Sequence, residues 1–160
     1  VVRIETDRTN TPSLSLTQRS QTAAEIRDSS VSSVVQIDFD ATVSERNFYR
    51  SLLEILRRDL PASTALSITA LASWCAGDDW LSDLPIDEAV PMLFRLGVDQ
   101  RQFHRRLETG QRFESRMCQN SAGVSTDEPV NTPPVRRLYI FSPKPWSKSS
   151  FAAAMEAYQR

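Results

Sequence analysis

The chain has 160 residues and a net charge of −1, with 40% hydrophobic residues, 24% charged residues, 4 glycines and 2 cysteines. This length is enough for one domain with a hydrophobic core, and the composition excludes a collagen-like chain, a disulfide scaffold and a fully disordered protein. The near-neutral charge excludes a uniformly basic nucleic-acid binder, although a protein with one basic face remains compatible with it.

Residues 1–33 are polar and rich in serine and threonine, and no apolar period organises most of them. This composition predicts a flexible tail, with a nascent helix near residues 22–27. From residue 34 to residue 160 we expect one globular domain that is mainly α with a small β component. Its first element is a short strand over residues 34–39, where apolar and β-branched residues alternate.

Two helices are expected after this strand. Ser44 can cap a helix over residues 45–58, because its apolar residues recur at helical spacing on one face and Pro61 follows its end. Residues 62–76 are apolar most of the way round, which predicts a second helix at the centre of the core. Gly77 then suits the turn that ends this helix.

A third and a fourth helix follow in the prediction. Asp87 can cap a helix over residues 87–95, with Pro91 close to the first turn, where a missing N–H costs least. Asp99 begins a capping box that opens the next helix, which runs to about residue 108. These two helices and the short turn between them contain the most informative motif in the chain.

The C-terminal part is expected to contain one loop, one strand and one helix. Residues 117–134 have the Gly, Pro, Asn and Asp content of a loop. Residues 136–141 predict a strand, and Ser147 can cap a last helix.

Residues 92–110 resemble the helix-turn-helix superfamily of DNA-binding proteins. Gly97 lies where the chain must turn sharply, and its two apolar neighbours point inward. Phe103 and Leu107, four residues apart, would anchor the second helix on the core. Leu93 departs from the pattern, because the position four before the glycine is usually small.

The resemblance implies that the second helix enters the major groove of DNA with its polar side chains outward. A strand over residues 111–117, paired with the one over 136–141, would complete a winged helix. The segment from position 95 to position 116 contains six arginines and three acidic residues, which supports a local basic face. The residues expected to contact DNA are Gln100, Arg101, His104, Arg105, Arg106, Arg136 and Arg137.

The segment Asp38-Phe39-Asp40-Ala41-Thr42 resembles the nucleophile motif of haloacid-dehalogenase-type phosphatases. The resemblance implies Asp38 as the nucleophile and Asp40 as the acid/base, with Mg²⁺ between them. That family usually has glycine in place of Ala41, and it needs a lysine followed by an acidic pair. Here the acidic residues Asp127-Glu128 precede Lys144. This phosphatase is therefore disfavoured, and the two carboxylates are expected to be solvated at a strand end.

No metal or cofactor site is expected, and the chain is predicted not to be an enzyme. His104 is the sole histidine and has no serine or cysteine partner at a recognisable spacing. Together with Cys75 and Cys118 it matches no zinc pattern. Cys75 lies in an apolar run and is interpreted as a small buried hydrophobic residue.

The sequence thus predicts a DNA-binding protein that acts through its helix-turn-helix in transcription regulation or plasmid replication. The alternative is a helical protein–protein interaction module, such as a secreted effector or adaptor domain, whose exposed apolar patch would include Trp74, Trp80, Leu84 and Met92. Two cysteines favour a reducing compartment, and no apolar run reaches membrane-spanning length. A cytoplasmic location is expected, with an exported effector as the alternative.

Overall fold

A computed structural model describes residues 1–6, 16–29, 33–97, 109–130 and 132–158, together with the single residues 100, 103, 105 and 107. Six parallel strands form one sheet in which the spatial order of the strands is the order of the chain. The strands are β1 (Val2–Arg3), β2 (Val34–Asp38), β3 (Ala65–Leu71), β4 (Glu88–Met92), β5 (Ser121–Ser125) and β6 (Arg137–Phe141). The helices and 3₁₀ turns used below are α1 (Leu16–Ser29), η1 (Val43–Glu45), α2 (Arg46–Asp59), α3 (Ala72–Cys75), η2 (Asp79–Leu81), η4 (Arg116–Cys118) and α5 (Lys148–Tyr158).

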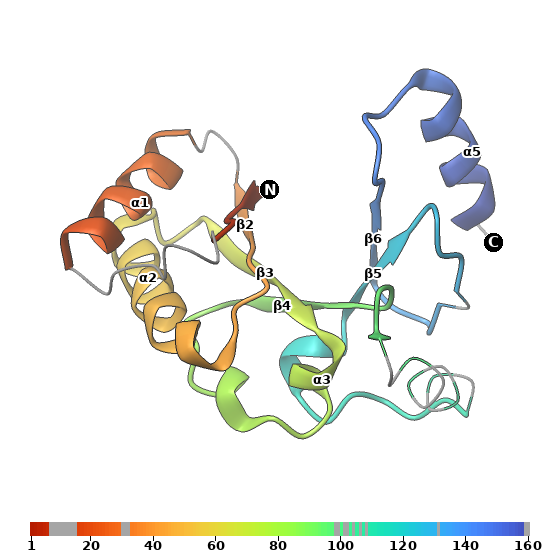
Figure 1. Cartoon of the computed structure of the whole chain (residues 1–160), viewed down its shortest axis with the longest axis horizontal. Coiled ribbons are helices and arrows are strands. Elements are labelled where there is room, and N and C mark those ends of the chain that lie inside the picture. The colour runs from red at the N-terminus through yellow and green to blue at the C-terminus, as the bar shows by residue number, and fades with distance from the viewer. Residues whose placement is uncertain are drawn as a thin grey trace.

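The sheet curls because each strand is added on the same side of the one before it. Parallel crossovers are right-handed, so an unreversed strand order bends the sheet in one direction, as in part of a barrel. α1 and α2 lie together on one side, and α5 stands at the other end beside β6 (Figure 1). The expected mainly α fold is therefore wrong: the chain is an α/β protein with an all-parallel half-barrel.

The two faces of the sheet differ in chemistry. On the convex face, the alternate residues of the strands that are covered by α1 and α2 belong to the hydrophobic core: Val35, Ile37, Leu66, Ile68, Ala70 and Ala89. The residues between them point to the concave face and are mostly polar, although they are buried: Gln36, Asp38, Ser67, Thr69 and Glu88. Because side chains alternate along a strand, the polar set shares one surface.

Four predicted elements are confirmed in type and place. β2 and α2 occupy the strand expected over residues 34–39 and the helix expected over 45–58, and β6 and α5 match the strand over 136–141 and the last helix. The start of α2 differs in detail, because the 3₁₀ turn η1 precedes it. Thr42 caps η1, where the Glu45 carboxylate accepts the Thr42 N–H at 2.8 Å, and Glu45 rather than Ser44 is the N-cap residue of α2.

Parts of the segment expected to be a flexible tail are built into the fold. Val2–Arg3 forms β1 and pairs with β2, while Leu16–Ser29 forms α1. α1 buries Ala23 and Ile26 in the hydrophobic core and packs on α2. The predicted nascent helix falls inside α1.

The helix predicted over residues 62–76 is wrong for most of its length. Residues Ala65–Leu71 form β3, and only Ala72–Cys75 is helical. The alternation within β3 is short, with Ser67 and Thr69 between apolar residues, and the apolar or small residues on either side hide it in the sequence. The prediction of central burial is correct, since Leu66 and Ile68 are fully buried.

The helix predicted over residues 87–95 is also wrong, and with it the first half of the helix-turn-helix. Glu88–Met92 forms β4 and pairs with β3 along its whole length. Pro91 has no N–H group to donate, but this costs little here. Along a strand, residues two apart direct their N–H groups to the same neighbouring strand, and the Leu93 N–H donates to Gly123 in β5. The N–H that Pro91 lacks would therefore also point to β5 and not to β3. There the β4–β5 pairing is short, Met92 with Gly123.

The predicted winged helix is not formed. β6 pairs in parallel with β5, which lies inside the segment expected as a loop. The last two residues of the expected partner strand, 116 and 117, belong to the 3₁₀ turn η4. The described residues Gln100, Phe103, Arg105 and Leu107 are helical, and Gly110 has the positive φ of 72° expected at a helix stop. The other residues between 98 and 108 lie outside the described part of the chain.

Cys75 and Cys118 form a disulfide between α3 and η4, which corrects the interpretation of Cys75 as a free buried residue. The Cys75 carbonyl also accepts the N–H groups of Glu114 and Ser115, at 3.1 and 3.2 Å. The segment before β5 is thereby tied to the end of β3. Among the described residues, no helix combines the length and apolar character that a bilayer crossing requires.

Candidate functional site

A cavity of about 370 Å³ lies at the carboxyl ends of the strands. Its walls include the last residue of every strand, from β1 to β6: Arg3, Asp38, Leu71, Met92, Ser125 and Phe141. The remaining lining residues follow β2, β4 and β6: Asp40, Phe94, Arg95, Ser142 and Pro143. Ligands of parallel α/β sheets bind at this edge, because the loops that follow the strands converge there.

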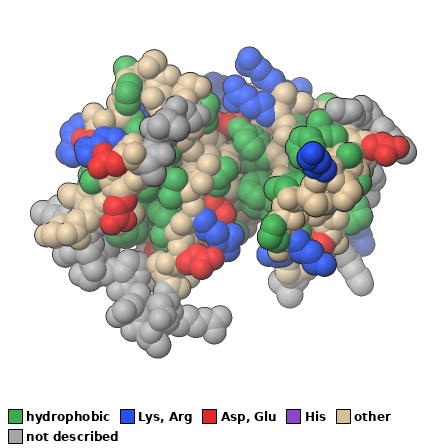
Figure 2. Space-filling view, turned by 90° about the horizontal axis from the view of Figure 1, so that it is seen from above, with side chains coloured by type: hydrophobic (Ala, Val, Ile, Leu, Met, Phe, Trp, Pro, Cys, Tyr) green, Lys and Arg blue, Asp and Glu red, His purple; other side chains and the backbone are tan. Residues whose placement is uncertain are grey.

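The cavity belongs to a larger hollow in the molecular surface. Seen from above, this hollow separates the side that carries α1 and α2 from the side that carries β6 and α5, and hydrophobic side chains lie along it (Figure 2). A second hollow of about 610 Å³ lies between α5 and residues 126–132. Its lining contains no Asp, Glu, Lys, Arg or His, so the smaller cavity is the chemically richer of the two.

Asp38 is buried and held through both of its carboxylate oxygens. Oδ1 accepts the hydroxyl of Thr69 at 2.8 Å, and Oδ2 accepts Nη1 of Arg3 at 3.1 Å. Thr69 is itself buried on the concave face of β3. The Arg3 guanidinium compensates the charge of the carboxylate, which a buried acid requires. This carboxylate is therefore fixed in position at the cavity wall.

Asp40 lies two residues beyond Asp38, at the exposed rim of the same cavity. The cavity wall encloses part of this carboxyl group and so raises the pKa of Asp40, and the nearby Asp38 carboxylate adds to the rise, while Arg3 and Arg95 oppose it. Loss of solvent contact and a like charge both disfavour the ionised acid. The two neighbouring carboxyl groups thus have different environments.

Arg95 forms the opposite wall with its backbone in a strained conformation. Its φ is +54°, a region that side chains other than glycine occupy at a cost of about 1–3 kcal/mol, mostly where function demands it. The Arg95 N–H donates to Oε2 of Glu128 at 2.9 Å, and its guanidinium lies 3.7 Å from Oδ2 of Asp127. The loop after β5 thereby holds the loop after β4.

Two phenylalanines supply an apolar surface beside these charges. The ring centroids of Phe94 and Phe141 are 5.7 Å apart, and the Arg95 guanidinium lies 5.9 Å from the Phe94 centroid. Ser125 completes the wall, and its hydroxyl donates to Asp127, which lowers the pKa of that carboxyl. The cavity therefore presents both an aromatic surface and fixed polar groups.

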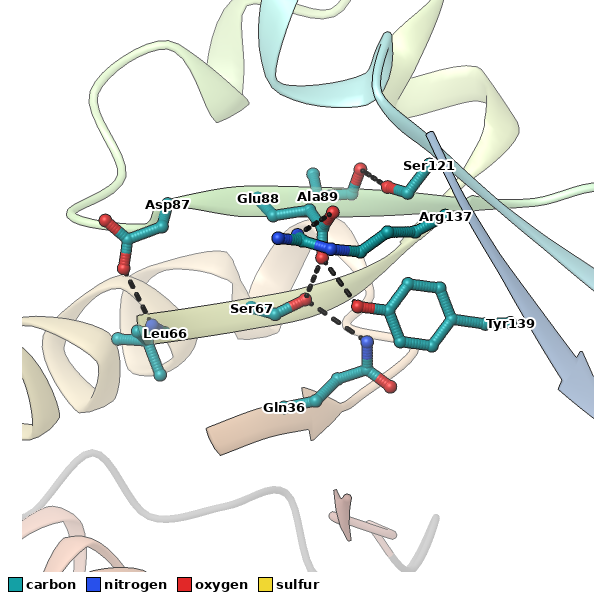
Figure 3. A network of polar contacts seen from close by, with 9 residues as sticks. All are labelled: Gln36, Leu66, Ser67, Asp87, Glu88, Ala89, Ser121, Arg137 and Tyr139. Atoms are coloured by element: carbon teal, nitrogen blue, oxygen red, sulfur yellow. Dashed lines mark hydrogen bonds and ion pairs between the residues drawn. The ribbon is translucent and has the colours of Figure 1, made fainter. Parts of the chain in front are cut away.

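A polar network lies next to the cavity on the concave face (Figure 3). Oε1 of the buried Glu88 accepts Nη1 of Arg137 at 2.9 Å, and Oε2 accepts the hydroxyls of Tyr139 at 2.8 Å and Ser67 at 3.2 Å. Gln36 donates to Ser67 at 3.2 Å, whereas its amide oxygen has no hydrogen-bond partner among the described residues. This network positions β6, whose last residue forms a cavity wall.

The residues expected to contact DNA are not gathered into the cavity. Gln100 and Arg105 are exposed, as is Arg136 before β6. Arg137 is also exposed, and its guanidinium pairs with the carboxylate of Glu88 at 2.9 Å. The remaining three, Arg101, His104 and Arg106, lie outside the described residues. The first helix of the expected helix-turn-helix is replaced by the strand β4, so the motif that was to present the DNA-contacting residues is not formed.

The apolar patch expected for a protein partner is not exposed. Trp74, Trp80 and Leu84 are buried, and Met92 is half-buried in the cavity wall. The two tryptophan rings pack edge to face with centroids 5.2 Å apart. Both are core residues, Trp74 in α3 and Trp80 in η2.

The phosphatase remains disfavoured on the geometry of its proposed nucleophile. Asp38 is already paired with the cationic Arg3 guanidinium at 3.1 Å, which disfavours a second cation such as Mg²⁺ at the same carboxylate. Asp127 and Glu128 bind Ser125 and the Arg95 backbone instead. Within the described ranges, no three His, Cys, Asp or Glu side chains are grouped so that they could hold a metal ion.

Comparison with known proteins adds no relative: no protein-family model, curated protein or solved structure matches this chain. The site therefore rests on its geometry. Sequence reasoning singled out Asp38 and Asp40 from their position after a strand. It missed Arg3, Arg95 and Phe141, because they meet only when β1, β4 and β6 are recognised as parallel strands of one curled sheet.

Proposed function

We propose that this protein binds a small hydroxyl-rich ligand, such as a saccharide, in the cavity at the carboxyl ends of the strands. The observation that carries the proposal is the convergence there of the last residue of all six strands. Sites built at this edge are supported by rigid strands, which hold their side chains in fixed positions. A volume of about 370 Å³ lies within the ordinary range for small-molecule sites.

The chemistry of the lining favours a neutral polar ligand. Two acids and two arginines line the cavity, namely Asp38, Asp40, Arg3 and Arg95, so neither sign of charge dominates. Hydroxyl groups donate to carboxylates and accept from guanidinium groups, so a polyol satisfies both kinds of side chain. The ring of Phe141 offers an apolar surface to the carbon-bound hydrogens of a sugar ring.

Saccharide binding can be tested with a pair of matched variants. Saturation-transfer NMR with neutral mono- and oligosaccharides, followed by calorimetric titration of each hit, measures binding to the wild type. Phe141→Ala removes a cavity wall, whereas Phe151→Ala removes an exposed ring on α5 outside the cavity. We expect at least a tenfold loss of affinity for Phe141→Ala and none for Phe151→Ala. No binding by the wild type, or equal binding by both variants, would overturn the proposal.

Binding of DNA and docking of a protein partner stay separate predictions from the sequence. The structure lacks the features on which both predictions were based. β4 stands where the first helix of the helix-turn-helix was expected, and the tryptophans of the expected apolar patch are buried. Anisotropy of labelled duplex DNA at two salt concentrations tests the first, since binding to phosphates weakens with salt. The cavity proposal does not depend on that outcome.

A further inference from the structure

The two carboxyl groups of the cavity are equipped for different roles. Asp38 is buried and accepts hydrogen bonds at both oxygens, from Thr69 and from Arg3. Asp40 is at the rim, and no described residue donates a hydrogen bond to it. Acid–base catalysis needs such a pair, in which one carboxyl group keeps its proton while the other is ionised.

We propose that this pair hydrolyses the glycosidic bond of a bound saccharide, with Asp40 as the general acid and Asp38 as the general base. This inference rests on the proposed saccharide binding. The bond between the anomeric carbon and the leaving oxygen breaks, and that oxygen keeps the electron pair and takes the proton of Asp40. A water oxygen bonds to the anomeric carbon while Asp38 accepts a proton from the water. One glycoside and one water give a hemiacetal, which is the new reducing end, and one alcohol, and the aspartates return to their starting protonation through solvent.

The assignment of the two roles follows from their surroundings. Asp40 holds its proton to higher pH than an ordinary aspartate, because its carboxyl group is partly enclosed and lies near the Asp38 charge. Asp38 pairs with the Arg3 guanidinium, and each of its oxygens has a second lone pair that can accept a water proton. The general acid thus lies at the open rim and the general base against the wall.

A symmetric pair of aspartates that share one proton, as in aspartic proteases, is not what this geometry provides. Such a pair needs two carboxyl groups in equivalent surroundings. Here only Asp38 is paired with arginine and threonine. Glycoside hydrolysis is a reaction that two carboxyl groups of different protonation catalyse.

The experiment separates binding from cleavage on the same samples. Each saccharide that the wild type binds is incubated in H₂¹⁸O, and mass spectrometry detects one ¹⁸O atom at the new reducing end. The matching 4-nitrophenyl glycosides are assayed in parallel. Asp40→Asn and Asp38→Asn are compared with Asp83→Asn, the same change at an exposed aspartate outside the cavity.

We expect the wild type and Asp83→Asn to cleave the saccharide at equal rates. Asp40→Asn should lower kcat by about 100-fold or more while the Kd stays within about threefold. The loss of kcat in Asp40→Asn should be smaller on 4-nitrophenyl glycosides, because 4-nitrophenolate leaves without being protonated. Asp38→Asn should lose activity on both kinds of substrate.

Two results would overturn the inference in distinguishable ways. A saccharide that is bound but not cleaved rejects hydrolysis and leaves the binding proposal standing. Full activity of Asp40→Asn rejects the assigned acid. If the wild type binds no saccharide, the binding proposal and this inference fall together.

Discussion

The hydroxyl of Tyr139 on β6 donates a 2.8 Å hydrogen bond to the carboxylate of Glu88 on β4, although β5 lies between the two strands. The curl of the sheet brings β4 and β6 toward each other on the concave face. The central residue of β5 is Gly123, which has no side chain, so the side chains of Met92 and Phe141 occupy the space where its Cβ would lie. The contact therefore fixes β6, and with it Phe141, across the cavity.

Removing this hydroxyl should weaken the fold measurably. Tyr139→Phe deletes a hydrogen bond to a carboxylate, so we expect a loss of about 1.5–3 kcal/mol in the free energy of unfolding. Urea unfolding measures it. Tyr158→Phe is the control, because that hydroxyl makes a longer bond of 3.3 Å to a neutral backbone carbonyl and should cost less. An equal loss in both variants would show that the Glu88 contact has no special weight.

Gly123 is the second requirement for the contact between β4 and β6 across β5. A Cβ atom at this position would lie 2.8 Å from Sδ of Met92 and 3.2 Å from a ring carbon of Phe141. Overpacking of this kind costs about 1–3 kcal/mol, so Gly123→Ala should lower stability by that amount and weaken saccharide binding through displaced Phe141. Met92→Ala removes the closer clash. In a double-mutant cycle, the pair should therefore lose less than the sum of the single changes; strict additivity would contradict the crowding.

The elements that could be predicted from the sequence are those with a local signal. α2 has its apolar residues on one face and a proline after its end, and β2 and β6 are short runs of β-branched and aromatic residues. β3 and β4 are buried parallel strands with a continuous apolar or small character, which periodicity alone does not distinguish from a buried helix. β5 has the composition of a turn, Ser-Ala-Gly-Val-Ser, because small residues fill the concave side.

The candidate site could be predicted only in part for the same reason. Asp38 and Asp40 follow a recognisable strand, so their pairing is visible in the sequence. Arg3 joins them through the two-residue strand β1, which carries almost no sequence signal. Arg95 and Phe141 join through the order of the strands in the sheet, a property of tertiary structure and not of any local window.

The raised pKa of Asp40 predicts a pH-dependent cost to stability. Its folded pKa lies above the ordinary aspartate value of 3.8, so between these two values the folded state binds more protons than the unfolded state. Stability should therefore fall as pH rises through that interval and then stay lower. Asp40→Asn should raise the melting temperature at pH 7 and have no such effect at pH 3. A variant that is less stable than wild type at pH 7 would contradict this.

Asp87 should show the opposite dependence. Its carboxylate accepts the Leu66 N–H at 2.7 Å and the Arg57 guanidinium at 2.6 Å, and these bonds lower the pKa of Asp87, the backbone bond most. The stability that the ionised form contributes is present above pH 3.8 and is lost as pH falls through the lower folded value. Asp87→Asn should thus lower the melting temperature at pH 7, with a difference that narrows toward pH 2. A difference independent of pH would assign the effect to hydrogen bonding alone.

The disulfide between Cys75 and Cys118 should be a major contributor to stability. It closes a loop with a sequence separation of 43, for which the chain-entropy model gives about 4 kcal/mol. Urea unfolding with and without dithiothreitol measures this, and a thiol titration in urea verifies complete reduction. The double variant Cys75→Ala/Cys118→Ala should unfold at the same urea concentration with and without reductant. Two free thiols in the untreated protein, or an unchanged wild-type midpoint after full reduction, would contradict the prediction. A stabilising disulfide would also favour an oxidising compartment over the reducing one expected from the cysteine count, because such bonds persist where thiols are oxidised.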